Sequence, residues 1–380
     1  MYFSKALKTK EMKKNILITL LLLSCICIQA QEKKFNLIIG TYTKSCESKG
    51  IYVYDFNAET GDFQFKSSTE NVINPSFVSV SKNNDFIYSV NEDGPKSTVS
   101  AFKYDTSNAK IEFVNKQEIH NPGPCYIIND DKNVITANYT GGSVAVFGKN
   151  KNGSLTELKQ LIKHSGKGIN PARQEKSHVH SVQFSPDHQF VLATDLGTDK
   201  MYLYQYNPKV AKPLELKDSI KVKAGSGPRH FAFSKNGQQL YLLQELDGTL
   251  SVFNYNKGKL VLVQETTVLA PDFKGTSTAA DIHISPDQRF LYATNRKEAN
   301  TISCFKILKD GKLALASRTS SLGDGPRNFA IDPTGNFLLV GHQYTNNVVV
   351  FKRNKETGAL TDTGKRIELC APVCLVFTEK

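Results

Sequence analysis

A unit of about 50 residues recurs along this chain, and the recurrence limits the folds open to it. Each copy has an apolar strand, a turn rich in Pro, Asp, Asn and Gly, and a second apolar strand. Six copies are complete, at residues 75–92, 124–139, 179–196, 228–245, 279–296 and 326–343. Their first strands end at Val80, Ile128, Phe184, Phe233, Ile284 and Ile331, which gives intervals of 48, 56, 49, 51 and 47 residues. Such even spacing favours one repetitive domain over two separate sandwiches.

Two further strand patterns lie between successive copies, as at residues 250–255 and 260–263, and no helical periodicity appears. Four strands per repeat are typical of a β-propeller blade. A seventh copy starts at residue 370 and stops after one strand. Residues 35–65 contain further strands that can supply the ones missing from this copy. We therefore predict an all-β, seven-bladed β-propeller, with the ring closed by N- and C-terminal strands that share one blade and leave no open sheet edge.

The fourth copy shows how the repeat places side chains. The sequence GSGPRHFAFSKNGQQLYLLQE, residues 225–245, predicts a hairpin because Asn236 and Gly237 both tolerate the backbone of a tight turn. A hairpin brings the start of its first strand beside the end of its second. Arg229 and Glu245 should therefore lie at the same end of the sheet.

Aligning the copies gives two equivalent positions at that end. The position near the start of the first strand is Ser76, Cys125, His180, Arg229, Ala280, Arg327 and Val373. The position that closes the second strand is Glu92, Tyr139, Leu196, Glu245, Arg296 and Gln343. Because the first strand of a propeller blade borders the central channel, we expect both sets to line one mouth of that channel. A purely structural position should carry similar residues in every copy, so the variation indicates a site.

The residue types in this set suit an anionic small molecule. Arginines offer fixed charge and planar donors for carboxylate or phosphate. A carboxylate and an imidazole can activate water or move a proton. The candidate site residues are His180, Arg229, Glu245 and Arg296, with Arg327, Gln343, Glu92, Asp281 and His283 as candidate substrate-binding residues and His178 and His230 beside them. Taken singly, an arginine at a strand end is more often a surface ion-pair partner, a lone histidine is more often a structural hydrogen-bonded residue, and Glu245 has the alternative role of pairing with Arg229.

The longest interval contains residues 164–177, which fit no strand pattern. Long loops on a compact scaffold are often functional, and this loop leads into the His178 and His180 pair. That pair has no third ligand at metal-binding spacing, so we predict neither a metal site nor a cofactor.

The amino end predicts export. Lys13 and Lys14 precede an apolar run at residues 16–28, which is followed by Ala30. This is the pattern of a secretory signal peptide, and the run is too short for a stable membrane span. We expect a signal peptide over residues 1–30, cleaved near Ala30, and a single propeller domain over residues 31–380 that is periplasmic or secreted. The alternative is a lipoprotein acylated at Cys25.

The mature chain remains basic. Five lysines and one glutamate in residues 1–30 account for +4 of the net charge of +12, which leaves about +8. This balance suits an anionic ligand. No dense basic stretch interleaved with aromatics is present, so nucleic acid is not expected as a partner, and we expect a monomer or a dimer.

Five cysteines remain beyond the signal peptide, namely Cys46, Cys125, Cys304, Cys370 and Cys374. Their odd number and scattered spacing indicate neither a disulfide framework nor a zinc site. We expect small buried side chains. A single disulfide is the alternative in an exported protein.

The sequence resembles a known family in several segments. These include IGTYT with SKGIYVYDF, NPSFVSV, ARQEKSHVHSV, GSGPRHFAF with LLQEL, AADIHISPDQRFLYATNR and GDGPRNFAIDPTGNFLLVGHQ. Along the whole mature chain they resemble the seven-bladed propeller lactonases, which include the propeller type of 6-phosphogluconolactonase and the fungal carboxy-cis,cis-muconate cyclase. The resemblance implies an active site of His180, Arg229, Glu245 and Arg296.

The expected activity is hydrolysis of an anionic or sugar-derived lactone, with Glu245 or His180 activating water. Two alternatives remain, a cycloisomerase acting on an unsaturated diacid and a non-catalytic propeller that binds a carbohydrate acid or a protein. Export departs from the cytoplasmic setting in which 6-phosphogluconolactone arises, so a phosphorylated substrate is left open.

Overall fold

The computed structural model describes residues 33–380, and the predicted signal peptide with Cys25 and Ala30 lies outside them. Residues 34–380 form one unit, built from 28 strands in seven four-stranded sheets. The only helical element of the described residues is a short 3-10 turn, η2 (Gly94–Lys96). In this part of the chain no helix has the length and apolar character needed to cross a membrane.

Each sheet is one blade, and the strand order confirms the predicted repeat. Blade 1 contains β28 (Pro372–Thr378), β1 (Lys34–Thr41), β2 (Ile51–Asn57) and β3 (Phe63–Ser68). Blade 2 contains β4 (Val78–Val80), β5 (Phe86–Asn91), β6 (Thr98–Asp105) and β7 (Lys110–Glu118). Blade 3 contains β8 (Pro124–Asn129), β9 (Asn133–Asn138), β10 (Ser143–Lys149) and β11 (Leu155–Lys163). Blade 4 contains β12 (Val179–Phe184), β13 (Phe190–Asp195), β14 (Lys200–Tyr206) and β15 (Leu214–Lys221). Blade 5 contains β16 (Pro228–Phe233), β17 (Gln239–Gln244), β18 (Thr249–Asn256) and β19 (Lys259–Thr267). Blade 6 contains β20 (Ala279–Ile284), β21 (Phe290–Asn295), β22 (Thr301–Ile307) and β23 (Leu313–Ser320). Blade 7 contains β24 (Pro326–Ile331), β25 (Phe337–His342), β26 (Asn347–Arg353) and β27 (Leu360–Glu368).

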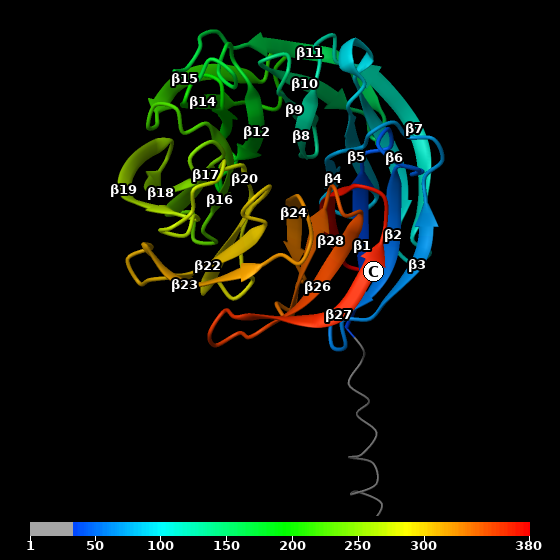
Figure 1. Cartoon of the computed structure of the whole chain (residues 1–380). Coiled ribbons are helices and arrows are strands. Elements are labelled where there is room, and N and C mark those ends of the chain that lie inside the picture. The colour runs from blue at the N-terminus through cyan, green and yellow to red at the C-terminus, as the bar shows by residue number, and fades with distance from the viewer. Residues whose placement is uncertain (1–32) are drawn as a thin grey trace, which may run out of the picture. The chain divides into compact units, whose positions relative to one another are not determined.

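The blades are arranged as a ring, so the predicted seven-bladed propeller is confirmed (Figure 1). The first strands, such as β8, β12, β16 and β24, lie nearest the centre, and the fourth strands, such as β7 and β19, form the rim. The innermost strands contact one another around the ring, including β28 with β4. Outer strands such as β19 contain only exposed and half-buried residues, whereas β17 and β21 are almost fully buried. The solvated face of the sheet is thus confined to the rim.

Blade 1 closes the ring as predicted. Its inner strand β28 pairs antiparallel with β1 from the other end of the chain, with Leu37 opposite Phe377 and Ile39 opposite Leu375. Leu37 and Ile39 also pack with Phe337 of blade 7 in one buried cluster. Burial of each large apolar side chain contributes about 1.5–3 kcal/mol, so the contact between the first and last strands stabilises the closed ring.

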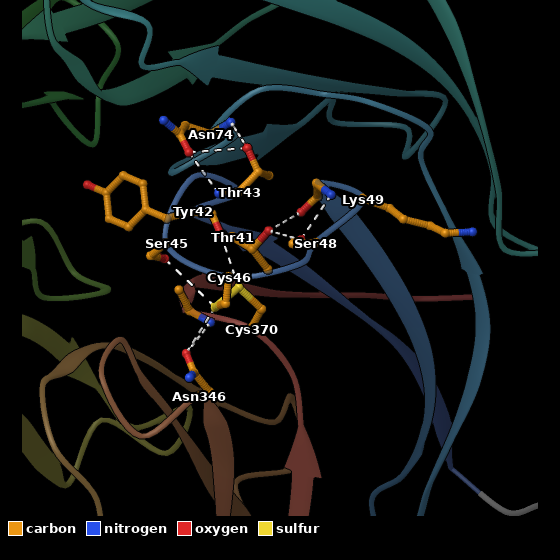
Figure 2. The surroundings of a disulfide bond; sticks show 12 residues. Thr41, Tyr42, Thr43, Ser45, Cys46, Ser48, Lys49, Asn74, Asn346 and Cys370 are labelled. Atoms are coloured by element: carbon orange, nitrogen blue, oxygen red, sulfur yellow. Dashed lines mark hydrogen bonds between the residues drawn. A yellow bond between two sulfur atoms is a disulfide. The ribbon is translucent and has the colours of Figure 1, made fainter.

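A disulfide reinforces the same closure. Cys46, in the loop after β1, is bonded to Cys370, which lies two residues before β28, across 324 positions of sequence (Figure 2). The expectation that these two cysteines are buried free thiols is therefore wrong, because ring closure brings together positions that sequence spacing cannot relate. Cys125, Cys304 and Cys374 are free and buried, as expected.

Tyrosine side chains link successive blades by one recurring hydrogen bond. The hydroxyls of Tyr88, Tyr241 and Tyr292 donate to backbone carbonyls in the following blade at 3.0, 2.9 and 2.7 Å. Each acceptor belongs to a glycine in the turn between the third and fourth strands of that blade. A buried phenol needs such a partner, and the bond fixes the spacing of neighbouring blades.

Candidate active site

The first set of aligned residues sits on irregularities of the inner strands. The β16–β17 register pairs Pro228 with Gln244 and then His230 with Leu243, so Arg229 is an extra residue, as in a β-bulge. The same shift occurs at Cys125, His180 and Arg327. A bulge leaves one residue outside the ladder and redirects its side chain. This local geometry turns the side chains of His180, Arg229 and Arg327 toward one end of the ring.

The second set lies at the same end because each hairpin has one additional backbone hydrogen bond. The Glu245 amide donates to the Gly227 carbonyl at 2.7 Å, and the Gln343 amide donates to Gly325 at 2.9 Å. Gly227 has φ of +66°, and a Cβ there would lie 2.7 Å from a side-chain carbon of Leu246. Glycine is therefore required before the proline. We call this end of the ring the Glu245 end.

Three arginines surround the carboxylate of Glu245. Arg229 Nε lies 2.9 Å from Oε2, Arg296 Nη2 lies 3.3 Å from Oε2, and Arg173 Nη2 lies 2.6 Å from Oε1. Burial alone would raise the pKa of Glu245, but the charges of Arg296, Arg229 and Arg173 outweigh it and lower the pKa to about 2. Glu245 is therefore an ionised anchor for the three guanidinium groups at neutral pH.

Arg173 was not among the predicted site residues. It comes from the loop between β11 and β12, which was expected to be functional only as a whole. Asn170 shapes this part of the loop by accepting from the Arg173 and Gln174 amides, and the Arg173 guanidinium also donates to the Tyr139 hydroxyl at 3.2 Å. The loop sequence has no periodicity that could have indicated which of its side chains turns inward.

His180 lies next to Glu245 without a hydrogen bond to it. Its Nε2 is 3.7 Å from Glu245 Oε2, and its ring contacts the Tyr139 ring edge to face. Burial and then the nearby charge of Arg229 lower the pKa of His180 well below the ordinary value for histidine. The imidazole is therefore neutral at physiological pH and has a lone pair available for a proton.

A second group of residues surrounds the carboxylate of Glu92. The Tyr42 hydroxyl donates to Glu92 Oε1 at 3.0 Å and accepts from Arg327 Nη2 at 3.0 Å, while the Ser76 hydroxyl donates to the same carboxylate oxygen. Among the residues that the structure describes, Arg327 has no ion-pair partner within 4 Å. Its charge remains available to an anionic ligand.

These residues enclose two adjoining cavities. The larger, about 190 Å³, is lined by Glu92, Gly123, Cys125, Tyr139, Thr140, Arg173, His180, Glu245, Arg296 and Arg327. The smaller, about 160 Å³, is lined by Arg173, Glu245, Thr278, Arg296, Lys297 and Tyr344. Arg173, Glu245 and Arg296 belong to both. The larger cavity is referred to below as the reaction cavity and the smaller as the side cavity.

Comparison with known proteins places the chain among propellers of the same kind. The family described as "Lactonase, 7-bladed beta-propeller" matches residues 36–377. The chain belongs to this lactonase family. A 6-phosphogluconolactonase of Bacillus subtilis is 36% identical over 349 residues, covering 90% of this chain and 98% of the relative. A 6-phosphogluconolactonase of Formosa agariphila is 36% identical over 332 residues, covering 85% and 94%.

A similar protein of known structure agrees with both the fold and the length. The Pseudomonas aeruginosa protein described as a periplasmic gluconolactonase, PpgL, superposes with a TM-score of 0.86 at 32% identity, covering 90% of this chain and 99% of that one. The four residues that the family resemblance implies, His180, Arg229, Glu245 and Arg296, lie together at the Glu245 end. His180, Arg229 and Arg296 each lie within 4 Å of Glu245.

Three residues predicted to bind substrate in this lactonase-family chain lie elsewhere. Gln343 directly follows β25 at the equivalent position, but it lines neither cavity. Asp281 and His283 line a separate cavity of about 720 Å³, together with turn residues such as Pro186 and Lys235 at the opposite end of the hairpins. Side chains alternate along a strand, so closeness in sequence to the bulged position did not place them in the same cavity.

Proposed function

We propose that this chain is an exported lactonase that hydrolyses an anionic, sugar-derived lactone in the reaction cavity at the Glu245 end. The observation that carries the proposal is a neutral imidazole beside an ionised carboxylate that is held by three arginines. Ester hydrolysis needs a base for water and positive charge at the developing oxyanion. The cavity offers both in a buried setting.

Of the two candidate bases, His180 fits better than Glu245. With a pKa of about 2, Glu245 accepts a proton poorly, and both its oxygens are engaged by guanidinium groups. His180 Nε2 is free to take a proton from water as that water attacks the lactone carbonyl carbon. The C–O bond of the ring then breaks, and the imidazolium returns the proton to the departing ring oxygen, giving a hydroxy acid. The new carboxyl group then releases its own proton to solvent and becomes the carboxylate.

The arginines supply the positive charge that this step requires. The tetrahedral intermediate carries an oxyanion, and the acid product is a carboxylate. Arg327, without an ion-pair partner in the described part of the chain, is the cation least committed to Glu245, and Arg173 is the most exposed of the three arginines that hold this carboxylate. We assign them to the oxyanion and the product carboxylate, with Arg229 and Arg296 as fixed partners of Glu245.

The side cavity supports an anionic or highly hydroxylated substrate. Among the residues that the structure describes, Lys297 forms neither an ion pair nor a side-chain hydrogen bond, and the buried Thr278 hydroxyl has no hydrogen-bond partner. Together with Arg173 and Arg296 these groups can bind a phosphate, a carboxylate or the hydroxyls of a sugar chain. The part of the lactone remote from its carbonyl would lie here.

Export is supported by three observations from different sources. The basic and apolar amino end has the pattern of a signal peptide. Cys46 and Cys370 form a disulfide, which persists in oxidising compartments. A similar protein of known structure is described as periplasmic.

The test is a titration assay that follows the acid released when δ-gluconolactone or its 6-phosphate opens. His180→Asn should lower kcat by about 10²–10⁴-fold because the base is lost, and KM should change little. His188→Asn, an exposed turn residue at the opposite end, is the matched control and should keep wild-type rates. Wild-type kcat in His180→Asn would contradict the assignment of the base.

A further inference from the structure

The guanidinium group of Arg229 has hydrogen-bond partners on the side that faces away from Glu245, in addition to Glu245 itself. Its side chain is buried, and its Nη1 donates to the Ala280 carbonyl and lies 3.3 Å from His230 Nε2. A guanidinium group can only donate hydrogen bonds. His230 Nε2 must therefore accept from Arg229 through its lone pair, and the proton of the neutral ring must sit on Nδ1.

The other ring nitrogen has a partner that enforces the same arrangement. His230 Nδ1 lies 2.8 Å from Asp281 Oδ1, and both side chains are at most 5% exposed. Asp281 Oδ2 accepts from Asn328 Nδ2 at 2.6 Å and from the Phe329 amide at 3.2 Å, and its remaining contact is with His283 Nε2 at 2.9 Å. The amide groups of Asn328 and Phe329 can only donate, so Oδ2 is fixed as an acceptor, and an ionised carboxylate accepts the His230 proton through Oδ1.

The charges agree with this assignment of protons. Burial and then the charge of Arg229 lower the pKa of His230 to about 4, so the ring is neutral at physiological pH. Burial would raise the pKa of Asp281, but the charge of His283 and hydrogen bonds from both histidines outweigh it, and the pKa falls below its ordinary value. A neutral imidazole between an anion and a cation has one favourable tautomer.

We propose that His230 and Asp281 are positioning residues, in which Asp281 holds His230 in its Nδ1–H tautomer and the Nε2 lone pair of His230 holds Arg229 against Glu245. The proposal rests on the proposed function for its effect on rate, but the tautomer itself does not. His230, Asp281 and Asn328 follow the bulged positions of blades 5 to 7 and are joined to one another by hydrogen bonds. Blades 2 and 3 carry Phe77 and Tyr126 at the equivalent positions, so packing alone does not call for polar residues there.

Asp281→Asn tests the interaction between Asp281 and His230 because it replaces a carboxylate oxygen by an amide donor while keeping the shape of the side chain. The asparagine amide can donate to His230 Nδ1, which moves the ring proton to Nε2. The Nε2–H group and the Arg229 N–H group then face each other, and no hydrogen bond can form between them. We expect kcat for δ-gluconolactone to fall about 100-fold, as for a small misplacement of a catalytic group, with KM changed by less than about threefold. Nitrogen-15 histidine spectra of the unliganded protein should show Nδ1 protonated in the wild type and Nε2 protonated in the variant.

Asp332→Asn is the matched control. Asp332 is equally buried but lies in the β24–β25 turn, where it accepts from backbone amides at the other end of the blade. It should change stability and leave kcat and the His230 spectrum as in the wild type. His230→Phe, which keeps bulk and removes both hydrogen bonds, decides the matter if Asp281→Asn does not fold, and it too should lower kcat about 100-fold.

Wild-type kcat in Asp281→Asn, or in His230→Phe where that variant is needed, would overturn the proposal. An Nε2–H tautomer in the wild-type spectrum would also overturn it. If the wild type hydrolyses no lactone, the proposed function fails, and the spectra alone still decide whether Asp281 sets the tautomer.

Discussion

At the scale of single residues, Glu245 shows that a buried carboxylate can be too well bound to act as a base. Three guanidinium groups hold it ionised, and the neighbouring His180 stays neutral because a proton there would be buried beside Arg229. The division of roles follows from the charge balance. Glu245 orders the arginines, and His180 moves the proton.

Acid should weaken the fold through His230. When unfolded, this residue takes up a proton as pH falls below about 6.5, but in the folded protein it does so only near pH 4. Between these values the unfolded state binds more protons, so the free energy of unfolding falls as pH falls. The full shift corresponds to about 3 kcal/mol.

The measurement is urea unfolding of the wild type and of His230→Phe at pH 7 and pH 4. The wild type should lose about 3 kcal/mol more than the variant over this range, because the titrating groups that do not contact His230 are common to both. Equal losses would show that His230 is not held neutral by the fold.

At the scale of elements, the β-bulges and the β11–β12 loop build the site on regular hairpins. The hairpins put two residues of each blade at one end of the ring, and the bulges turn selected side chains inward. The loop then adds Arg173 from outside the repeat. The repeating part supplies rigidity, and the irregular parts supply the chemistry.

Arg173→Ala should separate activity from stability. The side chain is 36% exposed, so its loss should change the free energy of unfolding by about 1 kcal/mol or less. It nevertheless holds Glu245 Oε1, and kcat/KM for lactone hydrolysis should fall about 10–100-fold. Lys176→Ala, exposed in the same loop, is the control for a lost positive charge and should behave as the wild type. Unchanged kcat/KM in Arg173→Ala would remove the loop from the active site.

The sequence predicted what the repeat governs and missed what lies outside it. His180, Arg229, Glu245 and Arg296 could be placed together because a shared hairpin register fixes their height in the sheet. Arg173 could not, since the loop that carries it has no period. Asp281 and His283 were placed too near the site because sequence proximity does not tell which way a strand residue points beside a bulge.

At the scale of the whole molecule, the two ends of the chain meet in blade 1 and are locked there. The loop that carries Cys46 also carries Tyr42 (Figure 2). The Tyr42 backbone amide donates to the Ala371 carbonyl beside Cys370, and the Tyr42 hydroxyl forms hydrogen bonds with Glu92 and Arg327. Ring closure and one wall of the reaction cavity therefore depend on the same loop. Cys46 and Cys370 could not be paired from sequence because only the closed ring brings them together.

The double variant Cys46→Ser and Cys370→Ser should lower the free energy of unfolding by about 2–4 kcal/mol. The bond constrains a very long loop of the unfolded chain, which is the main source of disulfide stabilisation in the chain-entropy account. Denaturant unfolding of wild type and variant, each with and without reductant, measures this. Reductant should lower wild-type stability to that of the variant and leave the variant unchanged, whereas equal stability of all four samples would contradict the account.

The most direct test of the account is the rate at which the protein opens δ-gluconolactone or its 6-phosphate in oxygen-18 water. We predict a product carboxylate that contains one solvent oxygen, because water attacks the carbonyl carbon. The enzymatic rate should fall about 10³-fold in Glu245→Gln, where the three arginines lose their shared partner. An unlabelled product would indicate a cycloisomerase, and labelled product formed at equal rates by wild type and Glu245→Gln would show that the chemistry does not take place at this site.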